Sequence, residues 1–343
     1  MRIFHSEAHR LHFPQGELSG GELVTPFERP SRIEYVLRRL AERGFAAPED
    51  PGAADLAAIA KVHDAGYLAF LEGAWDAWVA EGFRGEIIAT NVPARGMDAA
   101  RLPHGIEGRV GWYAHASETA ITAGTWRAAL GSAACAQAGA RAILGGARSA
   151  FALCRPPGHH ATADQFGGYC FLSNAAIAAQ MLRDGGAARV AVLDVDFHHG
   201  NGTQGIFYER GDVFLASIHG DPLHAYPHYI GYADETGRGA GEGANLNLPL
   251  PPGTLWPAWA EALDAALARI AERGAEALVL SLGVDAYKDD PISFFRLESA
   301  HFLEMGRRIG RAGLPTLACF EGGYAIEAVG VNAVNVLEGI EGA

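Results

Sequence analysis

Residues 189–204 read RVAVLDVDFHHGNGTQ and join an apolar segment to a strongly polar one. Arg189–Val195 is short, apolar and rich in β-branched residues, which is typical of a strand buried on both faces. The segment that follows, Asp196–Thr203, consists mostly of aspartate, histidine, asparagine and glycine. Functional groups in parallel α/β sheets gather beyond the carboxyl ends of the strands. This stretch therefore predicts a buried parallel strand with a functional site at its end.

Similar apolar segments recur along the chain, with helical segments between them. Further strands are predicted at Phe151–Cys154, Val213–Ile218, Ala277–Val284 and Pro315–Phe320. Helices are predicted roughly at Ser31–Arg43, Ala65–Ala80, Gly124–Gln137, Asn174–Asp184, Pro257–Arg273 and Ser299–Arg311. Continuously apolar strands that alternate with helices predict an α/β fold whose parallel sheet is covered by helices on both faces. No repeat or linker-like tract interrupts the pattern, so residues 1–343 are expected to form one domain.

Residues 82–122 do not follow this alternation. They show little hydrophobic periodicity and contain scattered proline and glycine residues. A long segment of this kind in a compact domain is usually functional or part of an interface. A tolerated surface insertion is the alternative, because additional loop length costs little free energy.

The composition restricts the classes of function. The chain has 343 residues, of which 49% are hydrophobic, and a formal net charge of −13. This acidity argues against nucleic-acid binding, which needs a basic surface, and it can attract cations. No apolar run is long enough for a membrane span, and the first residues lack a secretory signal, so a soluble cytoplasmic protein is expected. The cysteines have apolar neighbours and are expected to be buried, reduced thiols: Cys135, Cys154, Cys170 and Cys319.

Asp196, His198 and Asp285 are candidate metal ligands. Asp196 and His198 are separated by one residue at a strand end, so their side chains leave the chain on the same side. Asp285 follows the predicted strand Ala277–Val284 and can reach the same point. One imidazole and two carboxylates neutralise a divalent cation and leave positions open for water and substrate. An isolated Asp-x-His pattern also occurs in ordinary loops, but here polar clusters follow several strands.

The adjacent histidines His159 and His160 are candidates for proton transfer. They follow the rigid turn RPPG at residues 155–158. A histidine transfers protons well when its other ring nitrogen is anchored. Asp194 is a suitable anchor for His159, and the amide oxygen of Asn201 is one for His160. Adjacent loop histidines are otherwise solvated or structural.

Tyr324 follows two glycines, which allow the backbone to approach a ligand closely. Its phenol is suited to stabilise an oxyanion on a substrate carbonyl, although a packed aromatic after a turn is the alternative. A metal in this setting lowers the pKa of bound water towards about 7 and polarises an amide carbonyl. The two histidines would then serve as base and acid. No nucleophilic serine or cysteine motif competes with this prediction of amide hydrolysis.

Four motifs resemble those of the histone deacetylase superfamily. They are RPPGHHA (Arg155–Ala161), LDVDFHHGNGTQ (Leu193–Gln204), SLGVD (Ser281–Asp285) and EGGY (Glu321–Tyr324). Within the superfamily, the chain most closely resembles the bacterial acetylpolyamine amidohydrolases. That resemblance runs from the N-terminal FHSE to the last helix and includes KVHDAGYL at Lys61–Leu68. It implies an arginase/deacetylase fold with a single eight-stranded parallel sheet.

The resemblance also implies the bound ions and the roles of the site residues. Zinc is expected on Asp196, His198 and Asp285, with iron(II) possible because such ligands select poorly between these metals. The catalytic residues are expected to be His159, His160 and Tyr324, supported by Asp194 and Asn201. A structural potassium ion is expected to be surrounded by Asp194, Ser217 and the main chain of Asp196, His198 and Ile218.

Two positions separate the chain from binuclear arginases, which carry additional metal-binding aspartates. Gly200 and Gly283 stand at those positions here. This difference favours a mononuclear deacetylase. Tyr169 and Tyr226 are expected to line an acyl-lysine-shaped tunnel, with core packing as the alternative.

The loop at about 82–122 is expected to form a homodimer interface and to narrow the tunnel entrance. Within it, Glu118 and Glu107 are candidates to pair with the ammonium groups of a polyamine, and Glu17 is a weaker one. For each of them, an ordinary solvated glutamate is the alternative. The expected substrates are acetylputrescine, acetylcadaverine or acetylspermidine. The alternatives are protein acetyl-lysine, another acylated small amine, or a non-catalytic role in binding an acyl ligand.

Overall fold

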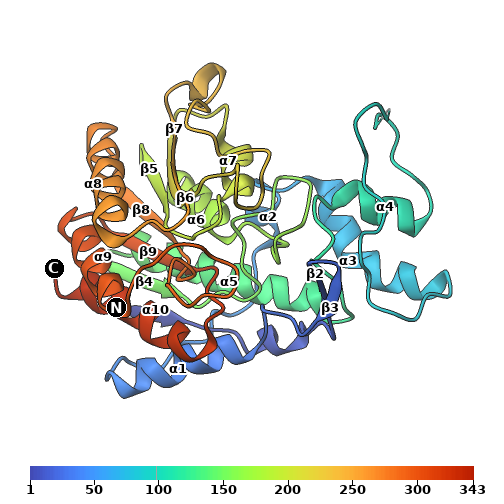
Figure 1. Cartoon of the computed structure of the whole chain (residues 1–343), viewed down its shortest axis with the longest axis horizontal. Coiled ribbons are helices and arrows are strands. Elements are labelled where there is room, and N and C mark those ends of the chain that lie inside the picture. Colours follow the sequence, from blue (N-terminus) through green and yellow to red (C-terminus); the bar gives the residue numbers. More distant parts are fainter. Residues whose placement is uncertain (98) are drawn as a thin grey trace.

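The computed structural model describes residues 1–97 and 99–343. Its centre is one sheet of parallel strands (Figure 1). In spatial order the strands are β1 (Arg2–Phe4), β4 (Ser149–Ala152), β9 (Thr316–Phe320), β8 (Ala277–Leu282), β5 (Val190–Asp194), β6 (Val213–Gly220) and β7 (Asn245–Leu250). All neighbouring pairs are parallel, which confirms the predicted α/β fold with a single parallel sheet.

This sheet has seven strands in the described residues, where the resemblance implied eight. Beyond β1 the chain forms only a parallel bridge between Phe4 and Glu49. Glu49 N donates to Ile3 O at 2.8 Å and accepts, through its carbonyl, from His5 N at 3.1 Å. The sequence around the bridge, APEDP at residues 47–51, has a proline on either side of it. Proline has no N–H to donate to a ladder, so the outermost pairing stops at a bridge.

Helices cover both faces of the sheet and enclose two hydrophobic cores. The first core includes α2 (Leu56–Ile59), α3 (Ala65–Ala80), α5 (Thr125–Leu144) and α6 (Asn174–Asp184). The second includes α1 (Ser31–Glu42), α8 (Trp256–Glu272), α9 (Ser299–Arg311) and α10 (Ile326–Glu341). In β5, Val190 and Val192 belong to the first core and Ala191 and Leu193 to the second. A strand that serves both cores must be apolar at every position, as the sequence is.

None of the helices in the described part of the chain is long and apolar enough to cross a membrane.

The described residues of the 82–122 segment extend from one end of the molecule together with α3 (Figure 1). The segment contains the helix α4 (Ile106–Tyr113) and an antiparallel bridge between Ile87 and Ile121. The sequence did not indicate α4, because Gly108 and Gly111 weaken its helical pattern. A Cβ at Gly111 would lie 1.6 Å from the backbone oxygen of Asn91, so the glycine permits close contact with the neighbouring loop.

A small antiparallel hairpin of β2 (Glu17–Ser19) and β3 (Glu22–Val24) was also not predicted. Gly20 and Gly21 form its turn with positive φ values of 59° and 86°, which glycine adopts without steric cost. The hairpin brings Glu17 to the wall of the cavity described below.

Candidate active site

Three buried side chains converge beyond the carboxyl ends of β5 and β8. Asp196 and His198 lie between β5 and the short helix α7 (Asn201–Phe207), and Asp285 lies beyond the neighbouring strand β8. His198 Nδ1 is 3.3 Å from Asp196 Oδ1 and 3.0 Å from Asp285 Oδ2. The potential ligand atoms of the three residues all lie within 4.8 Å of one another. The cluster therefore offers one imidazole and two carboxylates to a single ion.

The charges in this cluster favour a divalent cation. Burial and the neighbouring Asp196 raise the pKa of Asp285 to about 8, because two buried carboxylates repel each other. Burial also opposes ionisation of Asp196, but His159 and His198 hold the pKa of that carboxyl well below its usual value. A divalent cation would relieve the repulsion, and nitrogen and oxygen donors of this kind suit zinc or iron(II).

Two glycines leave room for the ligand carboxylates. A Cβ at Gly283 would lie 2.0 Å from Asp196 Oδ2, and one at Gly322 would lie 2.5 Å from the same atom. Gly322 N also donates a hydrogen bond to Asp196 Oδ2 at 2.8 Å. Any side chain at these positions would displace Asp196 from the cluster.

The paired histidines lie beside this cluster, each with one ring nitrogen engaged. His159 Nδ1 is 3.0 Å from Asp194 Oδ2, and His160 Nδ1 is 2.6 Å from Asn201 Oδ1. The two ring centroids are 4.0 Å apart. Because Nδ1 is occupied in each ring, Nε2 is the nitrogen left for proton transfer.

The two histidines differ in their tendency to hold a proton. Burial acts to lower the pKa of His159, but Asp196 and Asp194 outweigh burial and raise that pKa to about 10. Burial, together with His159 and His198, lowers the pKa of His160 well below its usual value. Adjacent groups with pKa values pushed in opposite directions can act as a proton donor and a proton acceptor.

Glu321 holds the turn that carries the histidines. Its Oε2 accepts hydrogen bonds from Gly158 N at 2.6 Å and from His159 N at 3.2 Å. Burial raises the pKa of Glu321 to about 7. Glu321 belongs to the EGGY motif, but nothing in the sequence indicated that its side chain fixes the backbone of another loop.

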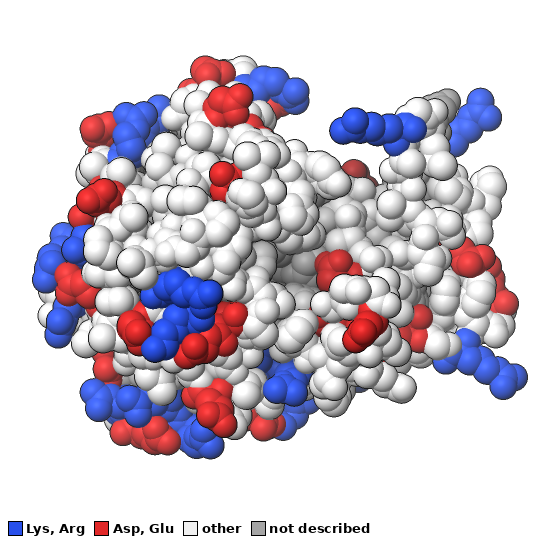
Figure 2. Space-filling model, in the orientation of Figure 1, with Lys and Arg blue, Asp and Glu red and all other residues white. Residues whose placement is uncertain are grey.

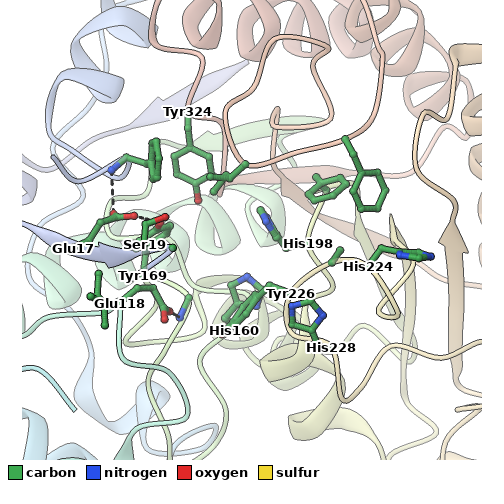
Figure 3. A pocket seen from close by; sticks show the side chains of 18 residues that line it. Glu17, Ser19, Glu118, His160, Tyr169, His198, His224, Tyr226, His228 and Tyr324 are labelled. Carbon is green, nitrogen blue, oxygen red and sulfur yellow. Dashed lines mark hydrogen bonds between the residues drawn. The ribbon is translucent and has the colours of Figure 1, made fainter. Parts of the chain in front are cut away.

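Tyr324 projects into the cavity from the loop after β9 (Figure 3). Gly323 has a φ of 128°, a conformation that favours glycine. Tyr324 N donates to Asp290 Oδ2 at 2.7 Å, and Arg32 Nε in α1 donates to Gly323 O at 2.7 Å. Burial raises the pKa of Tyr324, which keeps its phenol protonated as a hydrogen-bond donor. The contacts of Asp290 and Arg32 were not predicted, because they reach this loop from distant parts of the chain.

A cavity of about 460 Å³ leads to these groups. His160, His198 and Tyr324 line it together with the aromatic rings of Tyr169 and Tyr226 (Figure 3). The Tyr169 ring packs edge-on against Tyr324 at 5.7 Å, and the Tyr226 ring packs edge-on against His160 at 4.9 Å. Both predicted tyrosines thus lie in the cavity wall.

Two of the three candidate glutamates also lie in the cavity wall. Glu17 is 4% exposed, and its Oε1 accepts a hydrogen bond from the Tyr169 hydroxyl at 3.0 Å. Glu118 Oε1 accepts from Gly168 N at 2.8 Å. Glu107 is exposed on α4 and is not among the described residues that line the cavity of this chain.

Residues of the 82–122 segment hold the aromatic rings in place. The two ring nitrogens of His115 lie 3.2 Å from the Tyr226 hydroxyl and 3.2 Å from the His160 carbonyl oxygen. Thr119 Oγ1 accepts a hydrogen bond from Tyr169 N at 2.8 Å. These contacts were not predicted, because they join segments far apart in the chain.

The residues expected around potassium are buried, and two neighbouring strands bring some of them together. Asp194 in β5 pairs in register with Ser217 in β6, and Ile218 follows Ser217. Asp196 N donates to Asp194 Oδ1 at 3.1 Å. This arrangement is compatible with a cation between the two strands.

Comparison with known proteins identifies relatives along the full length of the chain. The pattern of the histone deacetylase domain matches residues 26–340. An acetylpolyamine amidohydrolase of Mycoplana ramosa is 56% identical, with 100% of both chains covered. Acetylpolyamine amidohydrolase 1 of Pseudomonas aeruginosa is 55% identical, with 100% of this chain and 99% of the relative covered. The crystal structure of an acetylpolyamine aminohydrolase from Burkholderia pseudomallei matches with a TM-score of 0.94 and 42% identity, covering 99% of this chain and 98% of the other.

Proposed function

The chain belongs to the histone deacetylase family, and on this premise we propose that it is a zinc-dependent hydrolase that releases acetate from N-acetylated polyamines. That it is a hydrolase acting on linear amides follows from its relatives, which are named amidohydrolases. The proposed substrates are of the acetylputrescine, acetylcadaverine and acetylspermidine type. The lining of the cavity supports acetylated polyamines as substrates, because aromatic rings and two carboxylates line its approach to His160, His198 and Tyr324.

Asp196, His198 and Asp285 would hold the zinc ion. Bound there, zinc would supply Lewis acidity to the acetyl carbonyl and lower the pKa of water. The donor set and the repulsion between the two buried carboxylates support this assignment. Iron(II) suits the same donors. The proposal includes a structural potassium ion beside Asp194 and Ser217.

The histidines would move the protons of the reaction. Amide hydrolysis requires that water lose a proton and that the leaving amine gain one. His159 and His160 present Nε2 for these transfers, while Asp194 and Asn201 hold the opposite nitrogens. The Tyr324 phenol would donate a hydrogen bond to the carbonyl oxygen as negative charge develops on it.

The cavity walls suit a flexible cation. An acetylated polyamine has a methylene chain that can lie along Tyr169 and Tyr226, and ammonium groups that are attracted to aromatic faces and carboxylates. Glu17 already bonds to the Tyr169 hydroxyl and to Phe27 N. Glu118 makes its contacts with Gly168 N and Thr119 Oγ1 through Oε1, so we assign the pairing role to Glu118 first.

The proposal extends to a homodimer formed through residues 82–122. Exposed apolar side chains in this segment support an interface: Val92, Met97 and Leu102 are 46%, 66% and 44% exposed. A partner packed there would restrict access to the cavity and exclude folded proteins. The four buried free cysteines fit a reducing cytoplasm.

Substrate preference tests the proposal. The zinc-loaded enzyme should have a kcat/KM for acetylputrescine, acetylcadaverine or acetylspermidine at least about tenfold above that for an acetyl-lysine peptide. One well-formed hydrogen bond between charged groups is enough to produce a difference of this size. Equal or better turnover of the peptide would favour the protein deacetylase instead.

Glu118→Gln tests the charge pairing separately, because glutamine keeps an acceptor for Gly168 N. It should lower kcat/KM for acetylputrescine about threefold to tenfold, as a partly exposed ion pair of roughly 1 kcal/mol implies. Turnover of neutral N-butylacetamide should not change. An equal loss on both substrates would reject the pairing.

A further inference from the structure

The N-terminal segment brings two histidines and a glutamate together outside the cavity. His5 follows β1, and Glu7 and His9 belong to the 3-10 helix η1 (Glu7–Leu11). The ring centroids of His5 and His9 are 5.0 Å apart, and His5 Nε2 is 3.4 Å from Glu7 Oε1. Potential ligand atoms of the three residues all lie within 4.8 Å of one another.

The two histidines are buried without well-formed hydrogen bonds. The His5 side chain is 7% exposed, and His9 is 2% exposed. Across residues 1–97 and 99–343, neither ring nitrogen of His9 has a hydrogen-bond partner, and the ring of His5 has only poorly aligned contacts with Glu7 and the Leu153 backbone. Leaving a buried polar group unsatisfied is energetically costly, so such groups normally have a partner. Two adjacent buried rings without a well-formed hydrogen bond leave room for one shared partner.

We propose that His5, Glu7 and His9 bind a second divalent transition-metal ion, with zinc as the best fit. Zinc takes imidazole nitrogen and carboxylate oxygen as ligands at about 2.0–2.1 Å, usually in a tetrahedron. Bonds of that length place neighbouring ligand atoms about 3.4 Å apart. His5 Nε2 and Glu7 Oε1 already have this separation. The Glu7 side chain is 72% exposed, so the ion would enter from solvent and retain water on its open side.

Two arginines near the site are paired with carboxylates. Arg10 lies 2.9 Å from Glu7 Oε2 and 2.6 Å from Glu34 Oε1. Arg155 lies 2.8 Å from Glu28 Oε1, an oxygen that it shares with Arg32. The Glu7 oxygen that faces His5 is Oε1, the one that Arg10 does not contact at hydrogen-bond distance.

The site would fasten the N-terminus to the turn that carries the paired histidines. The edge strand β1 has 3 residues and offers little pairing of its own. Arg155, which begins the RPPG turn, donates from Nη1 to the backbone oxygen of His9. An ion that bridges His5 and His9 would stabilise this attachment, because a ligand that binds only the folded chain shifts the folding equilibrium.

Zinc stoichiometry tests the proposal without reference to activity. Untagged protein is stripped with a chelator, titrated with zinc chloride and analysed for bound metal by mass spectrometry. Wild type should hold two zinc ions per chain. Asp285→Ala should hold one, and Asp285→Ala combined with His9→Ala should hold none.

Glu7→Gln keeps the test informative if His9→Ala fails to fold, because Glu7 is exposed. Combined with Asp285→Ala, Glu7→Gln should weaken the zinc affinity of the remaining site about tenfold or more. Loss of a residue that only supports a metal ligand already weakens metal affinity by about this factor, and Glu7 is itself a proposed ligand. His104→Ala, which changes an exposed histidine elsewhere, should leave both ions in place.

The outcomes for the two sites are distinct. A single zinc ion that is lost in Asp285→Ala and retained in Glu7→Gln would overturn the N-terminal site and leave the proposed function intact. A single ion that Asp285→Ala retains and His9→Ala loses would support the N-terminal site and contradict the proposed catalytic one.

Discussion

At the residue scale, the partner of each imidazole determines its chemistry. Asp194 gives His159 a charged acceptor, whereas Asn201 gives His160 a neutral one. Asparagine and aspartate have nearly the same shape, so the charge at this position can be altered with little change in volume. The contrast between the two anchors can therefore be tested directly.

Asn201→Asp should move the acidic limb of the pH–rate profile to higher pH. A carboxylate at the position of Asn201 Oδ1, 2.6 Å from His160 Nδ1, would stabilise the imidazolium and oppose the burial that lowers the pKa of His160. A proton acceptor works only above its pKa, so a higher pKa delays the onset of activity as pH rises. The shift should be about 1–3 pH units, as an adjacent opposite charge produces.

The measurement is kcat/KM for acetylputrescine across the acidic and neutral range. Asn91→Asp, at an exposed position, should leave the profile unchanged. If the profile of Asn201→Asp also remains in place, His160 is not the group whose deprotonation limits activity.

The sequence allowed the histidine anchors to be anticipated, because both lie next to the metal motif at the end of one strand. It did not allow the supports of the backbone to be anticipated. Glu321 bonds to the turn before His159, and Asp290 bonds to Tyr324 N. Both contacts join loops that meet only after the sheet has formed, so no local pattern encodes them.

At the scale of elements, predictions succeeded where signals were local. The predicted helix Ala65–Ala80 has the same bounds as α3, and the Asp64 side chain caps it by accepting from Gly66 N and Tyr67 N. The predictions failed where long-range contacts decide the structure. The strand β7 was missed because it contains Pro249, which is unusual in a strand and is tolerated here at the edge of the sheet. The helix α4 was missed because it contains glycines, one of which allows close contact with a neighbouring loop.

The helices α9 and α10 pack closely because Gly306 has no side chain. A Cβ at Gly306 in α9 would lie 2.1 Å from the backbone oxygen of Val336 in α10. Gly306→Ala should therefore force the helices apart and lower the free energy of unfolding by about 1–3 kcal/mol. The melting temperature measured by calorimetry or dye binding reports the change.

Gly73→Ala is the matched control, because Gly73 lies inside α3 and a Cβ added there would meet no atom within 4 Å. It should raise the free energy of unfolding by about 0.5–1 kcal/mol through helix propensity. Equal melting temperatures for the two variants would show that α9 and α10 can separate at no cost.

At the scale of the whole molecule, charge and shape act together. The net charge of −13 attracts cations over a distance, which would favour the approach of the proposed polyamine substrate. Figure 2 shows a hollow near the middle of one face, with acidic side chains beside it. Basic side chains project from the part of the molecule around α4 in the same view. Acidic side chains lie around α4 as well, and residues 82–122 contain as many acidic as basic residues.

The dimer proposal can be tested with the exposed apolar residues of this part. Met97→Glu combined with Leu102→Glu places two charges where the interface would bury apolar surface, and buried unpaired charges are strongly unfavourable. Sedimentation should change from a dimer to a monomer, while the melting temperature of the chain decreases little. Leu255→Glu, which alters a 60% exposed leucine just before α8, should leave the dimer unchanged. A wild-type monomer, or a double variant that remains dimeric, would remove residues 82–122 from the interface, and the restriction of substrates would then have to arise within one chain.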